Sequence, residues 1–231
     1  MLHEEHDSAL VLHTRAYKET SLIVQFFTRD LGRIAGVMRG ARRRKGGHLQ
    51  PFAVGMLAFA GRSNLVTVTK FEQARSIELH ADALVAGFYV LELLTRLIDE
   101  RQSEPTIFDA THVVLARLAS GLDVQRCLRP YELLLLDQLG YGIDFRYEAD
   151  SGKHIEPGKR YVFKNEFGFC EVAANESGRY LGSVLLAIAD DDFSDNSVAH
   201  IAKRIVRLRL APLLGERPLV SRKMLRIPSQ E

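Results

Sequence analysis

Short apolar runs alternate with polar or glycine-rich turns through the first 80 residues of the chain. The runs are rich in β-branched and aromatic side chains, and turn signals fall at residues 32, 42–47 and 61–64. This pattern predicts five strands: Ala9–His13, Leu22–Thr28, Arg33–Arg39, Phe52–Ala60 and Leu65–Lys70. Gly36 and Gly55 fall inside strands, where a closed sheet must bend. We predict a small five-stranded barrel of the OB type, although an SH3-like barrel fits the spacing nearly as well.

From Ala81 the apolar spacing becomes helical. Asp82 is the expected N-cap of a first helix whose apolar face widens enough to predict burial on most sides. Pro105 is expected in the first turn of a second helix over Ile107–Ala119, and Pro130 in the first turn of a third over Leu128–Leu139. The short connections predict a helical bundle beside the barrel.

The rest of the chain predicts a small sheet and two more helices. Arg160–Phe163 and Gly168–Val172 read as a hairpin, and Leu181–Ala189 as a short helix. A long helix is expected from Ser194 or Ser197 to Gly215, with Val198, Ile201, Ile205 and Leu208 toward the core. The predicted fold class is α+β, an OB-type barrel followed by a helical bundle with an inserted hairpin. We expect four segments: an OB domain at 1–80, a helical domain at 81–145 and 181–231, and the hairpin element at 146–180.

Charge is distributed unevenly, although the whole chain nets only +2. Residues 1–80 carry 12 Lys/Arg against 7 Asp/Glu, and residues 81–150 carry 6 against 12. Residues 151–231 carry 13 against 10, with 8 against 1 inside 201–226. Two basic regions therefore flank an acidic middle, which favours an acidic partner.

The strongest basic signal is at residues 29–45, where seven positive charges accompany one negative charge. Adjacent cations repel one another, and a polyphosphate offsets that cost by releasing its condensed counterions. A solvated basic loop is the plain alternative. On an OB-type barrel this loop predicts a groove for single-stranded nucleic acid, with Tyr17, Phe26 or Phe27 available to stack on bases. The expected DNA-binding residues are Arg15, Lys18, Arg29, Arg33, Arg39, Arg42, Arg43, Arg44, Lys45, Arg62 and Lys70.

Motifs of catalysis and cofactor binding are missing from the sequence. It has no phosphate-binding loop, dinucleotide fingerprint, HExxH or GxSxG pattern, so we expect neither an enzyme nor a cofactor. Asp190, Asp191, Asp192 and Asp195 are expected to cap a helix; the alternative is a small metal-dependent nuclease. Two distant cysteines, no apolar run long enough for a membrane span and an acidic N-terminus predict a cytoplasmic protein.

Several stretches together resemble the RecO family, the recombination mediators of bacterial DNA repair. They are ALVLHTRAYKETSL (9–22), FTRDLGRIAGVMRGARR (27–43), LQPF (49–52), GRSNLVTVT (61–69), LRPYELLLLDQLGYGIDF (128–145) and LGERPLVSRKMLR (214–226). The resemblance spans most of the chain and implies an N-terminal OB domain and a central helical domain. It also implies a small element that is a four-cysteine zinc site in some relatives. Here Arg146, Tyr147, Ser151 and Gly152 stand where thiols are expected, so we predict no zinc and a fold held by packing.

The resemblance implies a function without catalysis. Proteins of this family bind single- and double-stranded DNA, anneal complementary strands, and act on strands coated by single-strand-binding protein (SSB). With RecR, and in some organisms RecF, they help to load RecA, which implies a location at the bacterial nucleoid. An OB-fold RNA-binding protein is the alternative that composition alone leaves open.

The resemblance also implies a site for the acidic C-terminal tail of SSB, in an apolar pocket with basic edges. By its position in the motif, Arg129 is expected to pair with the tail carboxylate, with Tyr131 and Leu135 lining the pocket. The acidic balance of residues 81–150 argues mildly against this place. Lys203, Arg204 and Arg207 are expected to supply the missing positive field.

Overall fold

A computed structural model describes residues 4–43, 49–172 and 179–221. Arg44 and Lys45 of the predicted basic loop lie outside these ranges, as do Arg222, Lys223 and Arg226. Two compact units divide the chain between Gly121 and Leu122 and again between Arg217 and Pro218. The first unit holds the barrel and two helices, and the second holds three helices and a small sheet.

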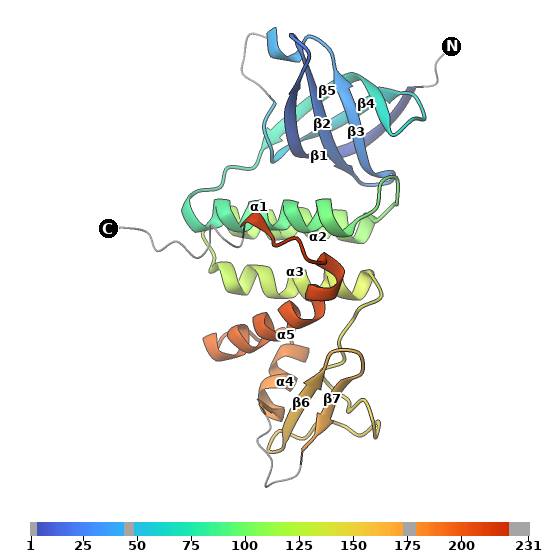
Figure 1. Ribbon diagram of the computed structural model, residues 1–231. Coiled ribbons are helices and arrows are strands. Elements are labelled where there is room, and N and C mark those ends of the chain that lie inside the picture. Colours follow the sequence, from blue (N-terminus) through green and yellow to red (C-terminus); the bar gives the residue numbers. More distant parts are fainter. Residues whose placement is uncertain (1–3, 44–48, 173–178, 222–231) are drawn as a thin grey trace. The chain divides into compact units, whose positions relative to one another are not determined.

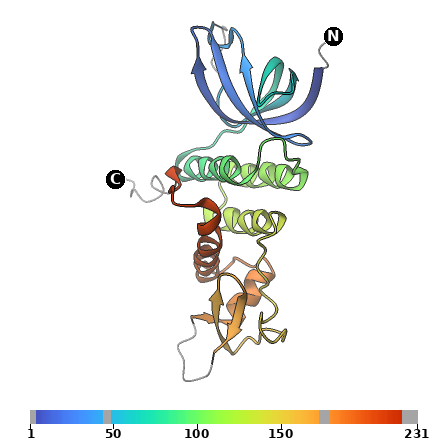
Figure 2. The ribbon, with the colours of Figure 1, turned by 45° about the vertical axis from the view of Figure 1, so that its right-hand side comes forward.

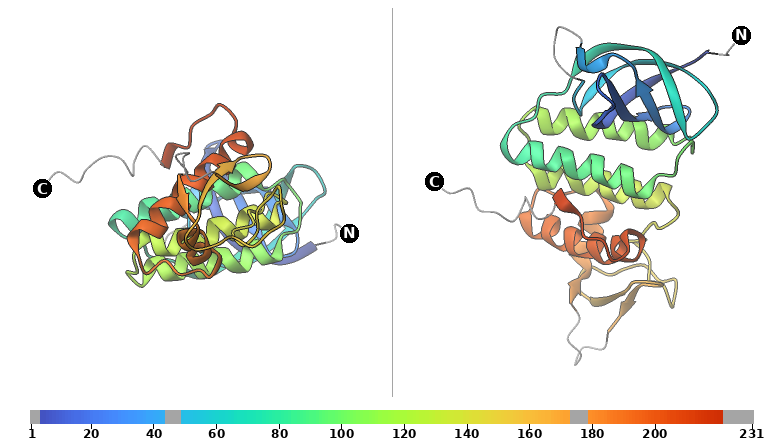
Figure 3. Two further views of the ribbon diagram at one scale, coloured as in Figure 1. Left: turned by 90° about the horizontal axis from the view of Figure 1, so that it is seen from below. Right: turned by 45° about the horizontal axis from the view of Figure 1, so that its top comes forward.

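The first unit contains a closed five-stranded barrel (Figures 1 and 3). Around the barrel the strands follow the order β1-β2-β3-β5-β4, and β1 pairs with β4 to close it. The pairing of β3 with β5 is parallel, whereas the other neighbours are antiparallel. This arrangement is that of the OB fold, so the predicted barrel is confirmed. The strands are β1 (Glu4–Tyr17), β2 (Ser21–Thr28), β3 (Gly32–Met38), β4 (Ala53–Ala60) and β5 (Leu65–Ser76).

Alternate residues of each strand fill the barrel. Val24, Phe26 and Phe59 have no exposed surface, and the rings of Phe26 and Phe71 lie 5.4 Å apart. Burying a side chain of this size contributes roughly 1.5–3 kcal/mol, so this core is the main source of the barrel's stability. Phe26 is therefore a core residue and cannot stack on a base in this fold.

Close approach of neighbouring atoms explains the two glycines inside the strands, with backbone atoms at Gly55 and side-chain methyls at Gly36. A Cβ on Gly55 would lie 2.1 Å from the carbonyl oxygen of Glu72, next to a register shift between β4 and β5. A Cβ on Gly36 would lie 2.6 Å from a methyl of Val68. A larger residue at either position would force its neighbours to shift, and the predicted bend at these glycines stays a prediction.

Two helices, α1 (Ala81–Leu97) and α2 (Pro105–Ala119), complete the first unit. Phe52 of the barrel packs on Phe88 with ring centroids 5.0 Å apart. The predicted N-cap of α1 is wrong, because His80 occupies that position and Asp82 lies in the first turn. Pro105 lies in the first turn of α2, as predicted.

The last described segment, residues 218–221, contacts α1. The carboxylate of Glu92 accepts hydrogen bonds from the backbone N–H groups of Val220 and Ser221, at 2.8 and 3.0 Å, and from the Ser221 hydroxyl at 2.5 Å. Leu219 and Ser221 are buried. Residues 218–221 therefore pack and hydrogen-bond as part of the first unit.

The second unit packs three helices with a three-stranded sheet (Figure 2). The helices are α3 (Val124–Gln138), α4 (Gly182–Ala189) and α5 (Asn196–Leu214), and the strands are β6 (Arg160–Lys164), β7 (Gly168–Glu171) and β8 (Tyr180–Leu181). The predicted hairpin is confirmed, since β6 pairs with β7 in antiparallel register. Its aromatic core includes Tyr161 and Phe169, which have no exposed surface.

Helix α3 begins earlier than predicted. Asp123 caps it by accepting a hydrogen bond from the backbone N–H of Arg126, which places Pro130 inside the helix rather than in its first turn. Inside the helix Pro130 cannot donate to the carbonyl of Arg126, which weakens α3 at this point, whereas the aspartate cap fixes the start of the helix. Arg129, expected at the start of this helix, consequently lies in its second turn.

Hydrogen bonds support the segment in which Arg146, Tyr147, Ser151 and Gly152 stand where the resemblance implies thiols. Asp144 accepts from the backbone N–H groups of Arg146 and Tyr147, at 2.8 and 3.1 Å. The Ser151 hydroxyl donates to the buried carboxylate of Glu148. These donors do not fit a thiolate zinc site. Within the described residues no group of three or more His, Cys, Asp or Glu is placed to hold a metal, and the absence of zinc stays a prediction.

Candidate nucleic-acid interface

The basic residues of the barrel meet where the β1–β2 turn approaches the segment that follows β3. There a single 3₁₀ turn, η1 (Ala41–Arg43), packs on the turn. The Arg42 backbone N–H donates to Thr20 at 3.0 Å, and its guanidinium donates to the carbonyl oxygens of Lys18 and Glu19 at 3.0 and 3.1 Å. These bonds hold the turn and η1 together without neutralising the charge of Arg42.

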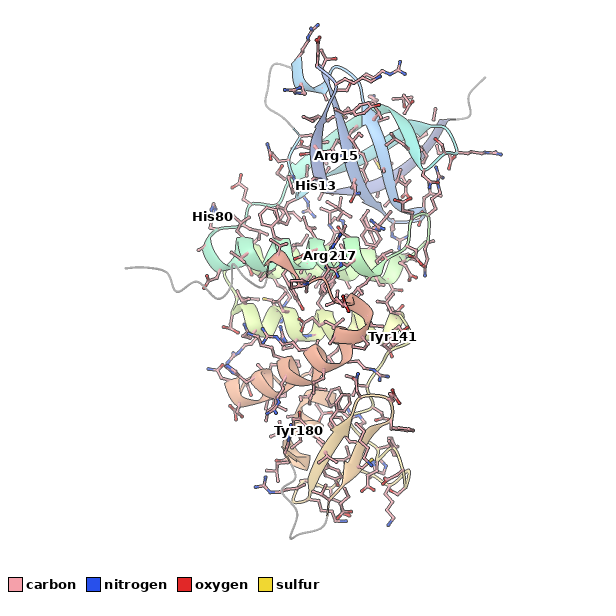
Figure 4. All side chains as sticks on the ribbon, in the orientation of Figure 1. His13, Arg15, His80, Tyr141, Tyr180 and Arg217 are labelled. Atoms are coloured by element: carbon pink, nitrogen blue, oxygen red, sulfur yellow. The ribbon has the colours of Figure 1, made fainter. Side chains whose placement is uncertain are left out.

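Solvent reaches the cations around this contact. Arg15 on β1 (Figure 4), Lys18, Arg39, Arg42 and Arg43 are all exposed. None of them pairs with a carboxylate among the residues that the structure describes. We call these five residues the basic end of the barrel.

An aromatic ring lies within the basic end. The Lys18 ammonium is 5.4 Å from the centroid of the Tyr17 ring, which is half-buried. A ring held beside a cation has one face suited to a base and an adjacent charge suited to a phosphate. The arrangement thus combines the two contacts that single-stranded nucleic acid requires.

The outer side of β2 and β3 continues from the basic end. OB folds receive oligonucleotides on this side and on the β1–β2 and β4–β5 loops. Ile23 and Val37 pair across the strands near the basic end, whereas Phe27 and Arg33 pair at the other end. We call this surface the β2–β3 face.

Later segments cover the far end of the β2–β3 face. The rings of Phe27 and Phe108 lie 5.5 Å apart, so Phe27 packs on α2 and is unavailable for base stacking. The Arg33 guanidinium donates to the carbonyl of Ile98, and the Arg101 backbone N–H donates to Arg33 at 3.0 Å. Among the described residues, these contacts cover the end of the face that is far from the β1–β2 turn.

Three predicted DNA contacts are occupied by partners of their own. Arg29 forms a fork with Asp109 of α2, with its Nε and Nη2 atoms 3.1 and 2.9 Å from the carboxylate oxygens. The hydrogen bond from Arg29 holds the pKa of Asp109 below its usual range. Arg33 is half-buried, which lowers the pKa of its guanidinium. Lys70 pairs with Glu72. Their role in binding DNA stays a prediction that competes with these contacts.

Arg62 lies in the β4–β5 loop, and a residue that the sequence did not single out supports that loop. Arg101 donates through Nη2 to the carbonyl of Ser63 at 3.2 Å, and Ser63 donates to Leu65 at 2.8 Å. Arg101 has a left-handed backbone, with φ of 60°. Nothing local in the sequence marks such a role, because its partner lies 38 residues earlier in the chain.

The second unit carries a basic groove along α5. It has a volume of about 700 Å³, and its lining includes Lys203, Arg204 and Arg207, which sequence analysis groups together. Arg179 and His200 add polar edges, while Tyr180, Ile201 and Leu208 supply apolar surface. We call it the α5 groove, and Figure 4 shows Tyr180 at the edge of the small sheet beside α4.

Leu208 corrects one prediction. It is 44% exposed and lines the groove instead of facing the core. The buried stripe of α5 runs through Val198, Ala202 and Ile205, which rotates Leu208 to the margin. A leucine on a basic helix reads as core in a sequence, and only its neighbours show otherwise.

The structure does not bring Arg129, Tyr131 and Leu135 to the α5 groove. Their exposed fractions are 2%, 3% and 0%, and the described lining of the groove contains none of them. The Arg129 Nη1 atom lies 2.8 Å from Oε2 of Glu132, one turn away on α3. An anion would have to displace this buried partner, and their role in tail binding stays a prediction.

The acidic run at residues 190–195 serves the fold. Asp195 caps α5 through the backbone N–H of Ser197 at 2.7 Å, as expected, and Asp192 accepts from the backbone N–H of Ser194 at 3.0 Å. Hydrogen bonds with these serines lower the pKa of both carboxylates. Asp190 pairs with Arg146 at 2.5 Å. In the described part of the chain Asp192 and Asp195 therefore form local caps, and Asp190 forms an ion pair.

Among the described residues, no helix is both long enough and apolar enough to cross a membrane.

Comparison with known proteins covers nearly the whole chain. Residues 1–77 match the family described as "Recombination protein O N terminal", and residues 78–223 match "Recombination protein O C terminal". The DNA repair protein RecO of Haemophilus influenzae (strain 86-028NP) is 39% identical over 227 residues, which cover 96% of each chain. The DNA repair protein RecO of Pseudomonas aeruginosa (strain LESB58) is 43% identical over 215 residues, with 93% of this chain and 91% of that protein covered.

Proposed function

The chain belongs to the RecO family of DNA repair proteins, and from this premise we propose that it is a noncatalytic mediator that binds and anneals DNA. A role in DNA repair and recombination follows from the family itself. The observation that supports strand binding is the basic end of the barrel, where Arg15, Lys18, Arg39, Arg42 and Arg43 face solvent without a described carboxylate partner.

Charge neutralisation is the proposed mechanism. Two complementary strands repel each other through their phosphates, and cations on one rigid surface lower that repulsion when they replace condensed counterions. The backbone bonds of Arg42 hold η1 against the β1–β2 turn, so the cations are presented together. No bond is made or broken in this step.

The α5 groove is the proposed site for the SSB tail. An acidic peptide with an aromatic end needs an apolar slot and adjacent cations. Ile201 and Leu208 provide the first, and Lys203, Arg204 and Arg207 provide the second. We extend the proposal to the partners of the family, with SSB held at this groove and with RecR, and in some organisms RecF, assisting the loading of RecA.

A salt titration tests the barrel surface. We expect the triple variant Arg39→Ala, Arg42→Ala, Arg43→Ala to bind labelled single-stranded DNA more weakly. Each phosphate contact contributes roughly 0.7 to the logarithmic salt slope on single strands, so the slope falls by about 2. The measurement is fluorescence anisotropy across salt concentrations, and an RNA of the same sequence tests the alternative of an RNA-binding protein.

The matched control removes three positive charges from the second unit: Lys153→Ala, Lys164→Ala, Arg160→Ala. It keeps the net charge of the test variant while leaving the barrel intact, so its slope should equal that of the wild type. Equal losses in both variants would mean that total charge governs binding, and the basic end would lose its assignment.

A peptide titration tests the α5 groove. We expect Lys203→Gln with Arg207→Gln to weaken binding of an acidic peptide that ends in Phe by about tenfold, since two cations leave the groove. Binding of naked single-stranded DNA should change little. If Arg129→Gln weakens binding of the acidic peptide and the double variant of α5 does not, the peptide site lies at α3 instead.

A further inference from the structure

A second groove of the second unit has the opposite charge to the α5 groove. It is lined by α3, by the segment that follows it, and by the end of α4, and its volume is about 900 Å³. Its apolar surface comes from Pro130, Leu133, Leu134, Ile143 and Ile188. We call it the α3 groove.

Carboxylates dominate the rim of the α3 groove. Asp137, Asp144 and Asp191 line it and are all exposed. Asp137 and Asp191 form no ion pair with any residue that the structure describes, and Asp144 bonds only to backbone N–H groups there. The cation of the lining, Arg146, is paired with Asp190 at 2.5 Å. The groove therefore presents an apolar floor under an uncompensated negative field.

This chemistry excludes the ligands that suit the rest of the molecule. Phosphates and an acidic peptide would meet like charges here, which costs several kcal/mol in a close contact. A segment with apolar residues on one side and Lys or Arg on the other satisfies both features of the groove at once. Leu133 and Leu134 are half-buried, so part of their surface remains for such a segment to cover.

We propose that the α3 groove is the docking site for a basic amphipathic helix of a partner protein. Apolar side chains of one face of that helix occupy the floor between α3 and the end of α4, as in other helix-in-groove complexes. Lysine or arginine side chains beside those anchors pair with Asp137 and Asp191. The proposal is independent of DNA binding, because no residue of the barrel takes part.

Peptide binding to the full-length chain tests the proposal. The probe is a labelled helical peptide with leucines on one face and lysines on the other, measured by fluorescence anisotropy at low salt. The comparison peptide has glutamate in place of every lysine. We expect saturable binding of the basic peptide and at least about tenfold weaker binding of the acidic one.

Substitutions locate the bound peptide. The double substitution Asp137→Asn with Asp191→Asn should weaken binding of the basic peptide by about tenfold, since it removes two negative charges from the rim. Leu134→Ser should weaken it similarly by removing part of the floor, with circular dichroism to check folding. The matched control is Asp82→Asn with Asp150→Asn, which removes the same number of charges from exposed carboxylates outside the groove. This control should not change the affinity.

Three outcomes would overturn the proposal. One is equal binding of the basic and acidic peptides, and another is unchanged affinity in the double aspartate variant. The third is a lower sedimentation coefficient of that variant without peptide, which would identify a second copy of the chain as the occupant. Single-stranded DNA binding by the same variant should match the wild type, so failure here is distinguishable from failure of the proposed function.

Discussion

The two ends of the β2–β3 face use their arginines in different ways. At one end Arg29 and Arg33 bind groups from residues 98–109 of the same unit. At the other end Arg39, Arg42 and Arg43 lie exposed, and among the described residues Arg42 bonds to backbone carbonyl groups. The sequence presents all five as one basic stretch. Whether an arginine is bound within the fold or lies exposed thus depends on which part of the face the later segments of the first unit cover.

The largest expected effect on stability comes from adding a side chain at Gly32, at the covered end of the β2–β3 face. Gly32 has φ of 71°, and a Cβ there would lie 2.0 Å from the carbonyl oxygen of Gln102. Gly32→Val should therefore lower the free energy of unfolding by about 3 kcal/mol or more, through backbone strain and overpacking. Urea denaturation of the full chain measures it. Gly40→Val, with φ of 67° but no atom near the added Cβ, separates strain from the clash.

If Gly32→Val and Gly40→Val lower stability equally, the approach of Gln102 to β3 contributes nothing. The covered end would then be no more firmly built than the open end, and the comparison would fail at its first step.

Replacing one arginine at each end gives a smaller effect that sharpens the contrast. Arg33→Met should cost roughly 1–2 kcal/mol of stability, because a half-buried charged donor to the Ile98 carbonyl is lost. Arg39→Met should leave stability nearly unchanged and reduce the salt slope of DNA binding. Thermal unfolding and anisotropy on both variants measure the two effects. A reduced slope for Arg33→Met at unchanged stability would move Arg33 to the binding surface.

The smallest effect concerns pH at α2. The rings of His112 and Phe108 meet edge to face, with ring centroids 4.6 Å apart. Burial lowers the pKa of His112, Arg75 lowers it further, and Asp109 opposes the change. The folded pKa of His112 lies below the unfolded value of about 6.5, so the folded state favours the neutral imidazole. The contribution of His112 to the stability of the folded state is present above about pH 6.5 and is lost as pH falls through the folded pKa.

We therefore expect Tm to fall between pH 7 and pH 5, and the fall to be smaller in His112→Gln. Thermal unfolding across this range measures it, with His200→Gln, an exposed histidine of the second unit, as the control. Identical pH profiles for wild type and His112→Gln would show that other groups set the dependence.

The barrel could be predicted from the sequence because its signals are local. Apolar runs and turn residues define each strand, and Gly36 and Gly55 stand where neighbouring atoms leave no room for a Cβ. The start of α3 was missed because Pro130 suits a first turn, whereas the deciding cap, Asp123, looks like any polar residue of a connection. Such choices depend on hydrogen bonds that a pattern does not show.

The candidate sites were predictable only in part. Arg39, Arg42 and Arg43 are exposed, as a basic loop suggests, but the partner of Arg29 lies 80 residues later in the chain. Arg129 was assigned from its motif, and its burial beside Glu132 could not be inferred from spacing. The α3 groove left no motif at all, since it combines an apolar floor and acidic rim from separate segments.

The hydrogen bonds from Val220 and Ser221 to Glu92 determine which unit of the protein is completed last during synthesis. Val220 follows Glu92 by 128 residues, so at bacterial rates of translation its amide emerges on the order of ten seconds later. Until then the nascent barrel and its first two helices lack their last piece. The ribosome therefore synthesises the whole second unit, Leu122–Arg217, between the two segments of the first unit. The first unit begins to emerge before the second and is completed after it.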